Sequence, residues 1–179
     1  MKDVIVLGGP NGAGKSTAVP GVIPPELGIV EFVNADEIAR GLSPLNPAGS
    51  EIAAGRLLIE RIRALRDAGQ SFGFETTCAG REHAALLREC RALGYRITLI
   101  FLWLPSPAAA LQRVARRVRE GGHGVERAIV TRRYAIGPVF ATLCTFICRW
   151  PISLLFTTIP TRAECWCLRR RQQAESCMT

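Results

Sequence analysis

A glycine-rich stretch near the start of the chain constrains the fold more than any other feature. It follows the apolar run 4–7 and reads Gly9-Pro10-Asn11-Gly12-Ala13-Gly14-Lys15-Ser16-Thr17. This order fits G-x-x-x-x-G-K-[ST], the P-loop pattern, in which glycines let successive backbone N–H groups surround a phosphate chain. Lys15 can reach the β- and γ-phosphates, and the Ser16 hydroxyl can ligate Mg²⁺. We therefore predict that residues 9–17 bind a nucleoside triphosphate. The alternative is a glycine-rich turn without a ligand.

Short apolar segments alternate with helical patterns along the chain. The expected strands cover residues 3–7, 29–33, 71–75 and 95–104. The expected helices follow the P-loop and cover residues 48–68, 81–93, 108–120 and about 125–135. This alternation predicts an α/β fold with a doubly wound parallel sheet and helices on both faces. No internal repeat or inter-domain linker interrupts the pattern.

Polar side chains follow the second and third expected strands, where each strand ends. Asp36 comes after the second, and Glu75, Thr76 and Thr77 end the third. The carboxyl ends of parallel strands share one edge of a sheet, so these groups are expected to face the P-loop. There Asp36 could accept a proton from a substrate hydroxyl or hold Mg²⁺ through water, and Glu75 and Thr76 could bind a polar acceptor. The alternatives are that Asp36 and Thr77 only cap the helices that follow them.

A cluster of arginines precedes a glycine pair in the second half of the chain. Arg113, Arg117 and Arg119 come before Gly121-Gly122-His123, and Arg132-Arg133 follow. Residues four apart share a helix face, which brings Arg113 and Arg117 together. We expect a small basic lid on a glycine hinge that stabilises charge on a transferred phosphoryl group. A solvated basic helix face is the alternative.

The apolar strand at 97–104 ends without an aspartate. A typical Walker-B strand, which regulatory GTPases and motor-type ATPases usually carry, is therefore not expected. Small-molecule kinases with a P-loop often lack this aspartate, and a carboxylate elsewhere, such as Asp36, then serves in its place. No N-K-x-D sequence for guanine is present, which favours ATP as the nucleotide.

The net charge, the N-terminal residues and the cysteines limit which other functions and locations are expected. The net charge of +8 suits a site that receives several phosphates, and nucleic acid is the second choice. Lys2 and Asp3 stand where an apolar leader would begin, so we expect a cytoplasmic protein with no membrane segment. Without a secretory signal, the seven cysteines are not expected to form a disulfide framework, and Cys165-Trp166-Cys167 is not a zinc pattern.

Four segments together resemble the zeta-toxin family of P-loop kinases. They are residues 8–17, Asn34-Ala35-Asp36-Glu37-Ile38-Ala39, Phe74-Glu75-Thr76-Thr77 and 113–123. The resemblance runs from Met1 to about Gly137 and implies a P-loop kinase-like domain over residues 1–137. It also implies that ATP and Mg²⁺ are used to phosphorylate the sugar 3′-hydroxyl of the sugar nucleotide UDP-N-acetylglucosamine, and that an antitoxin protein is the partner.

The resemblance also assigns roles to individual residues. Lys15 and Ser16 correspond to phosphate and metal ligands, and Asp36 corresponds to the base that activates the hydroxyl. Glu75 and Thr76 fall where the family contacts the sugar nucleotide. The lid arginines that match best, and that would neutralise the moving phosphoryl group, are Arg117, Arg119 and Arg133. One departure lies in the lid, where Glu126 stands in place of an expected proline.

Residues 138–179 form an atypical tail. Arg149 is the only charged residue between Ala135 and Thr161, and the resemblance stops near Gly137. Residues 148–161 can be back-translated so that another frame gives Pro-Leu-Ala-Asp-Ile-Ala-Ala-Val-Tyr-Asp-Asn-Thr-Asp, which looks like the family at this point. We therefore hypothesise a shift of reading frame near Gly137, which would leave the fifth strand and final helix missing or improvised. The nucleotide sequence of the gene tests this directly.

Three other functions remain open from the sequence. A P-loop kinase of another small molecule would share these residues, because the loops after the second and third strands set the acceptor. A basic NTPase that binds nucleic acid would show binding that falls steeply with salt, and the sequence has no aromatic and basic stripe for it. The last is an inactive, frame-shifted product that binds nucleotide weakly, which a thermal shift with ATP separates from the kinases.

Overall fold

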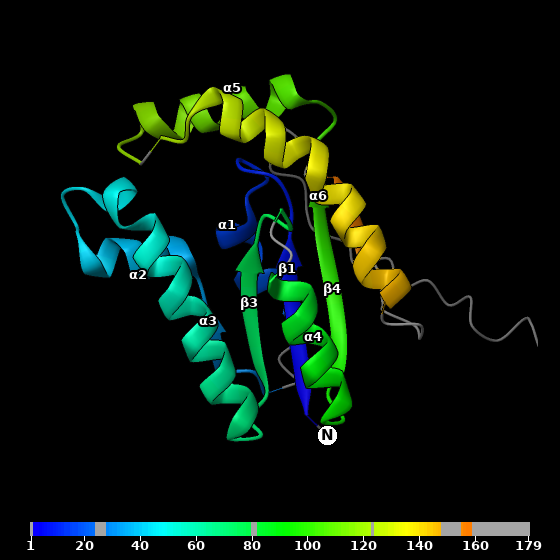
Figure 1. The fold of residues 1–179 in the computed structure, drawn as a ribbon. Helices are drawn as coiled ribbons and strands as arrows, with labels where there is room; N and C mark the ends of the chain where they lie inside the picture. The colour runs from blue at the N-terminus through cyan, green and yellow to red at the C-terminus, as the bar shows by residue number, and fades with distance from the viewer. Residues whose placement is uncertain (1, 24–27, 80–81, 123, 148–154, 159–179) are drawn as a thin grey trace, which may run out of the picture.

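The computed structural model describes residues 2–23, 28–79, 82–122, 124–147 and 155–158. Its centre is a sheet of parallel strands in the order β2-β3-β1-β4-β5 (Figure 1). The strands are β1 (Asp3–Gly8), β2 (Glu31–Val33), β3 (Phe72–Thr76), β4 (Arg96–Trp103) and β5 (Leu155–Thr158). The predicted doubly wound parallel sheet is therefore confirmed, and the four strands expected from the sequence all form.

Helices connect the strands in the expected alternation. They are α1 (Lys15–Val22), α2 (Ala35–Leu42), the short 3-10 helix η2 (Pro47–Ser50), α3 (Glu51–Asp67), α4 (Glu82–Ala92), α5 (Pro107–Arg119) and α6 (Arg127–Ile147). The start of α2 excludes one of the two alternatives for Asp36. Asn34 is the N-cap of α2, because its side-chain oxygen accepts the backbone N–H of Asp36 at 2.8 Å. Asp36 therefore lies inside the first turn and does not cap the helix.

Helices cover both faces of the sheet. This is required because successive side chains of its strands point to opposite faces and are apolar on both. Val4 and Val6 of β1 point into a core shared with α3 and α4, where Ile62 of α3 is fully buried. Ile5 and Leu7 point the other way, into a core with α1, α5 and α6. Each face thus has its own apolar layer, and β1 is buried along its whole length.

The strand order brings three strand ends to one edge of the sheet. β3 pairs directly with β1, with Leu7 opposite Glu75, and β2 pairs with β3, with Val33 opposite Phe74. All three strands run parallel, so the loops after β1, β2 and β3 leave the sheet on the same side. Helices α5 and α6, which carry the arginines of the predicted lid, pass over this edge (Figure 1).

Residues of the tail belong to two elements of the structure, the end of α6 and the strand β5. α6 continues without a break past residue 137 to Ile147, so the predicted boundary at 137 does not coincide with the end of an element. β5 extends the sheet next to β4, with Ile100 opposite Leu155. The tail therefore forms a fifth strand, but a short one of four residues. The frame-shift hypothesis expects the fifth strand to be absent or formed by residues not selected for it. Residues 148–154 and 159–179, and His123 of the lid, lie outside the described residues.

None of the described helices combines the length and the apolar character that a helix needs to cross a membrane.

Candidate active site

The loop between β1 and α1 has a backbone that requires glycine. Gly9, Gly12 and Gly14 all have positive φ angles, of 148°, 79° and 78°. A Cβ atom at Gly9 would lie 2.5 Å from the Leu102 carbonyl oxygen, and one at Gly12 would lie 2.9 Å from the Ala110 carbonyl oxygen. The glycines of the P-loop pattern are therefore needed for conformation and for space, and they let the loop wrap closely around an anion.

Lys15 is held across this loop. Its side chain is buried, and Nζ donates to the carbonyl oxygens of Gly9 and Pro10 at 2.9 and 3.0 Å. Burial lowers the pKa of the Lys15 ammonium, while the charges of Glu75 and Asp36 act in the opposite direction. The ammonium is thus fixed where the first turn of α1 meets the loop, ready for an anionic ligand.

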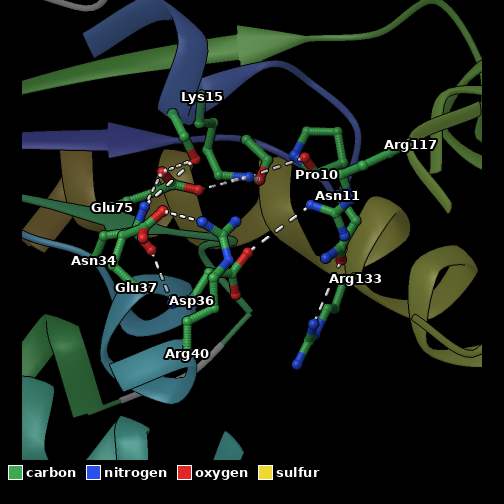
Figure 2. A network of polar contacts seen from close by, with 12 residues as sticks. Pro10, Asn11, Lys15, Asn34, Asp36, Glu37, Arg40, Glu75, Arg117 and Arg133 are labelled. Carbon is green, nitrogen blue, oxygen red and sulfur yellow. Dashed lines mark hydrogen bonds and ion pairs between the residues drawn. The ribbon is translucent and has the colours of Figure 1, made fainter. Parts of the chain in front are cut away.

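Glu75 joins the loop to the end of β3 (Figure 2). Its Oε2 accepts the Ser16 hydroxyl at 2.8 Å and the Asn34 amide at 3.0 Å, and its Oε1 lies 3.7 Å from Lys15 Nζ. The Asn34 amide also lies 3.4 Å from Ser16 Oγ. The carboxylate therefore sits beside the hydroxyl that the sequence marks as a metal ligand. Its position comes from the direct pairing of β3 with β1.

This position bears on two expectations from the sequence. The strand at 97–104 is not expected to end in a Walker-B carboxylate, and Asp36 is expected in its place; the structure adds Glu75 of β3, whose carboxylate lies beside Ser16. Glu75, predicted to contact the acceptor, binds Ser16 and Lys15. Thr76 is buried, and its hydroxyl accepts the backbone N–H of Cys78 at 3.0 Å, where Cys78 has a φ of 55°. Thr76 thus supports the turn after β3 and also borders the cavity.

Asp36 and Arg117 face one another from opposite sides of the site. Asp36 Oδ2 lies 3.9 Å from Arg117 Nη1, and both side chains are about one third exposed, at 40% and 35%. Arg117 Nε and Nη2 are buried without a hydrogen-bond partner in the described part of the chain. The guanidinium therefore points its Nη1 toward the Asp36 carboxylate (Figure 2), while its other two nitrogens are enclosed by the protein.

The other lid arginines divide into two groups. Arg133 of α6 donates to Asn11 Oδ1 at 3.5 Å, and Arg113 of α5 borders the cavity. Arg119 is exposed and is not among the residues around the cavity. The structure thus brings Arg117 and Arg133 to the loop and leaves Arg119 in solvent. The reason is helical phase, since Arg119 lies two residues and about 200° beyond Arg117 on α5.

Asn34 is a functional candidate that the sequence reasoning did not include. Its amide binds Glu75 and its oxygen caps α2, so one side chain fixes both the carboxylate and the helix that carries Asp36. The signal in the sequence is an asparagine between a strand and a helix, which indicates an N-cap. Its second contact depends on β3 lying beside β1, which no local pattern shows.

The glycine pair after α5 ends the helix and makes room for Arg117. Gly121 has a φ of 87°, and its N–H donates to the Val118 carbonyl oxygen at 3.1 Å, while the Gly122 N–H donates to that of Arg117 at 2.8 Å. These bonds form a Schellman motif. A Cβ atom at Gly122 would lie 2.6 Å from Arg117 Cγ and 3.0 Å from its carbonyl oxygen. The missing side chain at 122 therefore leaves the space in which the stem of Arg117 lies.

We predict that Gly122→Ala displaces Arg117 and lowers kcat about tenfold, because the added methyl group occupies the place of Cγ. Adding Gly122→Ala to Arg117→Ala should cause little further loss, since the crowded Cγ is then absent. Steady-state kinetics of the two single variants and the double variant measure this coupling. Equal losses from Gly122→Ala in both backgrounds would contradict the contact. Gly124→Ala, whose Cβ would lie 3.3 Å from Val118 Cγ2, is the control.

Lys15, Asp36, Glu75 and the arginines at 113, 117 and 133 border one cavity of about 940 Å³. The P-loop and the lid arginines border one part of it, and helices α2, α3 and the start of α4 border the rest. This volume lies at the upper end of the usual range for small-molecule sites. It exceeds what a triphosphate alone needs, so the cavity has room for a second substrate beside it.

The donor set fits a nucleotide triphosphate and Mg²⁺. The loop backbone, the Lys15 ammonium and the arginines at 113, 117 and 133 border the cavity and are groups of the kind that bind phosphate oxygens. The Ser16 hydroxyl beside the Glu75 carboxylate provides the oxygen ligands that Mg²⁺ prefers, and Mg²⁺ usually takes one or two protein oxygens together with phosphates and water.

Comparison with known proteins identifies the same region as the recognisable part of the chain. Residues 4–133 match the family model described as AAA domain. An uncharacterized protein of Haemophilus influenzae is 29% identical over 126 residues, which cover 70% of this chain and 88% of that protein.

Two solved structures are similar to this chain in fold. A candidate kinase from Chloroflexus aurantiacus superposes with a TM-score of 0.59 at 15% identity, with 88% of each chain covered. A gluconokinase from Sinorhizobium meliloti superposes with a TM-score of 0.50 at 14% identity, with 90% of this chain and 84% of that chain covered. At these identities the similarity concerns the fold alone. The P-loop kinase-like fold expected from the sequence is confirmed, and the zeta-toxin subfamily stays a prediction.

Proposed function

We propose that this chain, which belongs to the AAA domain family, is an ATP-dependent phosphotransferase acting on a hydroxyl group. The observation that carries the proposal is the placement of Asp36. Its carboxylate lies 3.9 Å from a lid arginine, in the cavity that also contains the P-loop lysine. A phosphate-binding loop alone supports only nucleotide binding. A carboxylate facing it across a cavity with room for a second molecule supports transfer to an acceptor.

Each side chain has a separate task in this reaction. The loop backbone and Lys15 hold the phosphates, and Ser16 and Glu75 would hold Mg²⁺, which would neutralise charge between the β- and γ-phosphates when bound. Asp36 orients the acceptor hydroxyl and takes its proton as the oxygen bonds to the γ-phosphorus. The bond to the β–γ bridging oxygen then breaks and ADP leaves. Arg117 and Arg133 stabilise the charge on the phosphoryl group during transfer.

The acceptor we propose is a sugar nucleotide, with the 3′-hydroxyl of UDP-N-acetylglucosamine as the reacting group. Its support is the resemblance of the loop, the Asp36 segment and the lid to zeta toxins, which also motivates an antitoxin protein as partner. The alternative is a P-loop kinase of another small molecule. Both place the acceptor hydroxyl at Asp36 and differ only in what fills the rest of the cavity.

Acceptor-dependent release of ADP tests this proposal. The full chain is incubated with ATP, Mg²⁺ and, in separate reactions, UDP-N-acetylglucosamine, other sugar nucleotides, free sugars and small hydroxy acids. The proposal expects ADP release to rise with one class of acceptor, sugar nucleotides first. Release that is the same with every acceptor and with none would contradict it.

Two arginines of α5, Arg117 and Arg119, provide a test variant and a matched control for the role of the lid. We expect Arg117→Ala to lower kcat about 100-fold or more, the effect typical of losing one preorganised charge-stabilising donor. Arg119→Ala should leave kcat within about twofold, because Arg119 is exposed and away from the cavity. Steady-state kinetics with saturating ATP measure both. A larger loss from Arg119→Ala than from Arg117→Ala would show that the lid closes on a different face of α5.

A further inference from the structure

The position of Arg133 depends on helix α6 more than on contacts of its own side chain. Its polar contact with Asn11 Oδ1, at 3.5 Å, is long for a hydrogen bond. A bond of this kind does not fix a long side chain by itself, because ordering the arginine costs rotamer freedom. The place of the guanidinium beside the P-loop is therefore set by how the backbone of α6 is held.

Tyr134, the next residue along α6, makes two contacts with the end of β4. Its hydroxyl donates to the Leu104 carbonyl oxygen at 2.8 Å. Its ring centroid lies 4.9 Å from that of Trp103, at an interplanar angle of 39°. Burial raises the pKa of the Tyr134 phenol, so the hydroxyl stays protonated and remains a donor. One side chain thus ties α6 to two consecutive residues of the sheet end.

Close packing also holds this part of α6, but it is not directional. Val130, one turn before Tyr134, is fully buried in the core on the α1 side of the sheet. Gly137, one turn after it, is buried, and a Cβ atom there would lie 3.3 Å from the Thr77 carbonyl oxygen. These contacts keep the helix close to the sheet. The hydrogen bond of Tyr134 depends on angle as well as distance, so it also fixes the rotation that aims Arg133.

The end of β4 also contacts the P-loop. A Cβ atom at Gly9 would lie 2.5 Å from the Leu102 carbonyl oxygen, so the loop backbone packs directly against this strand. Leu102 thus contacts the loop, and the two residues after it contact Tyr134. Figure 1 shows α6 passing this end of β4, which pairs with β1 and is largely buried. One strand end therefore sets the distance between the phosphate-binding loop and Arg133.

We propose that Tyr134 is a positioning residue: by holding α6 to the end of β4, it places the Arg133 guanidinium where it meets the γ-phosphate of the bound nucleotide. This inference rests on the proposed function, which gives Arg133 its role, and goes beyond it by naming the residue through which the fold sets that role. It also separates the two lid arginines. Arg117 depends on the space left at Gly122, and Arg133 depends on a tyrosine contact with the sheet.

Tyr95 provides a matched control. The chain has two tyrosines, and the Tyr95 hydroxyl also donates to a backbone carbonyl oxygen, that of Arg66, at 3.0 Å. Its ring also packs on an aromatic side chain, with 5.9 Å between its centroid and that of Phe72. Tyr95 lies directly before β4, at the end of the strand away from the P-loop. Changing either tyrosine to phenylalanine therefore removes the same type of hydrogen bond, but only Tyr134 is next to Arg133.

The affinity for a non-hydrolysable ATP analogue relative to ADP tests the inference without an acceptor. The full chain and its variants are titrated with each nucleotide and Mg²⁺ by calorimetry. An arginine at the γ-phosphate strengthens binding of the analogue alone, so Arg133→Ala should lower the affinity ratio about tenfold or more. Tyr134→Phe should lower it about three- to tenfold, because Arg133 is displaced and not removed. Tyr95→Phe should leave it within about twofold. A loss of stability alone would weaken both nucleotides equally and would not change the ratio.

Equal affinity ratios in the Tyr134→Phe and Tyr95→Phe variants would overturn the inference. So would an unchanged ratio in Arg133→Ala, because this arginine would then not meet the γ-phosphate. The double variant of Arg133→Ala and Tyr134→Phe tests whether the tyrosine acts through the arginine. Its ratio should equal that of Arg133→Ala alone, since the group that Tyr134 positions is absent. A further fall in the double variant would overturn the positioning role.

Measurements of transfer distinguish failure of this inference from failure of the proposed function. If an acceptor is phosphorylated, and Arg133→Ala lowers kcat at saturating ATP while Tyr134→Phe does not, the phosphotransferase proposal stands and the role of Tyr134 is wrong. If the affinity ratio depends on both residues but no acceptor is phosphorylated, the role of Tyr134 stands and the proposed reaction is wrong.

Discussion

Replacing Asp36 by asparagine should abolish phosphoryl transfer while leaving ATP binding intact. The variant keeps the size and shape of the side chain next to Arg117, and it removes the group that takes the proton of the acceptor hydroxyl. Loss of a positioned general base lowers a rate by about 100- to 10,000-fold. We therefore expect kcat to fall within this range and the Kd of the Mg²⁺–ATP complex to change by less than about threefold, since the P-loop contacts are not altered.

Glu37→Gln is the control for this prediction. Glu37 follows Asp36 directly, but its carboxylate pairs with Arg40 at 2.8 Å on an exposed part of α2. It should therefore leave kcat and the Kd for ATP nearly unchanged. Transfer at the normal rate by Asp36→Asn would rule out Asp36 as the base. A parallel loss of ATP binding would show instead that Asp36 belongs to the nucleotide site.

Replacing Lys15 by methionine should remove both nucleotide binding and transfer. Lys15 is the buried cation of the loop, and a hydrogen bond to a charged group contributes about 1.5–3 kcal/mol, or about 10- to 150-fold in affinity. Its charge is also expected to stabilise the transferred phosphoryl group, which adds a further loss in kcat. Titration of Mg²⁺–ATP by calorimetry measures the first effect, and single-turnover kinetics at saturating ATP measure the second.

Thermal unfolding provides a control for Lys15→Met. A ligand that binds only the folded state stabilises it by about 2.7 kcal/mol at 100 times its Kd, so ATP should raise the Tm of the unchanged chain. The same ATP concentration should leave the Tm of Lys15→Met almost unchanged, while the two proteins unfold cooperatively without nucleotide. An equal rise in both would mean that the triphosphate is bound elsewhere.

The loop and the sheet could be predicted from the sequence because their determinants are local. Glycines at 9, 12 and 14 mark positions of positive φ, and the short apolar segments between helical patterns mark buried parallel strands. The burial of Val4 and Val6 on one face of the sheet and Ile5 and Leu7 on the other follows from strand geometry alone. Even the early end of α1 at Val22 agrees with the prolines that begin at Pro20.

The role of Glu75 could not be predicted in the same way. Its contacts with Ser16 and Lys15 depend on β3, and not β2, lying beside β1. Strand order is a property of the whole fold, so no pattern around Glu75 distinguishes a ligand of the acceptor from a neighbour of the loop. Asn34 was missed for the same reason, since its amide bonds to Ser16 and Glu75 reach segments distant in the sequence.

The exposed position of Arg119, away from the cavity, has a local cause. Counting around a helix at 100° per residue puts Arg113 and Arg117 on one face and Arg119 on another. The periodicity therefore contained the distinction that the structure shows, and the resemblance of the whole basic segment hid it. The first part of α6 was predicted, but its continuation to Ile147 and the strand β5 were not, because the composition of the tail favours no element. The gene's nucleotide sequence decides whether the tail belongs to the original frame.

The most direct test of the proposed function is the fate of the γ-phosphate. The full chain is incubated with Mg²⁺, UDP-N-acetylglucosamine and ATP labelled in the γ-phosphate, and the label is located by chromatography and mass spectrometry. We predict that the label appears on the sugar nucleotide as a phosphate ester of its hydroxyl, with one ADP for each ester and none formed by Asp36→Asn. Label found only as inorganic phosphate, with this acceptor and with every other hydroxyl compound supplied, would contradict the assignment of this cavity as a phosphotransferase site.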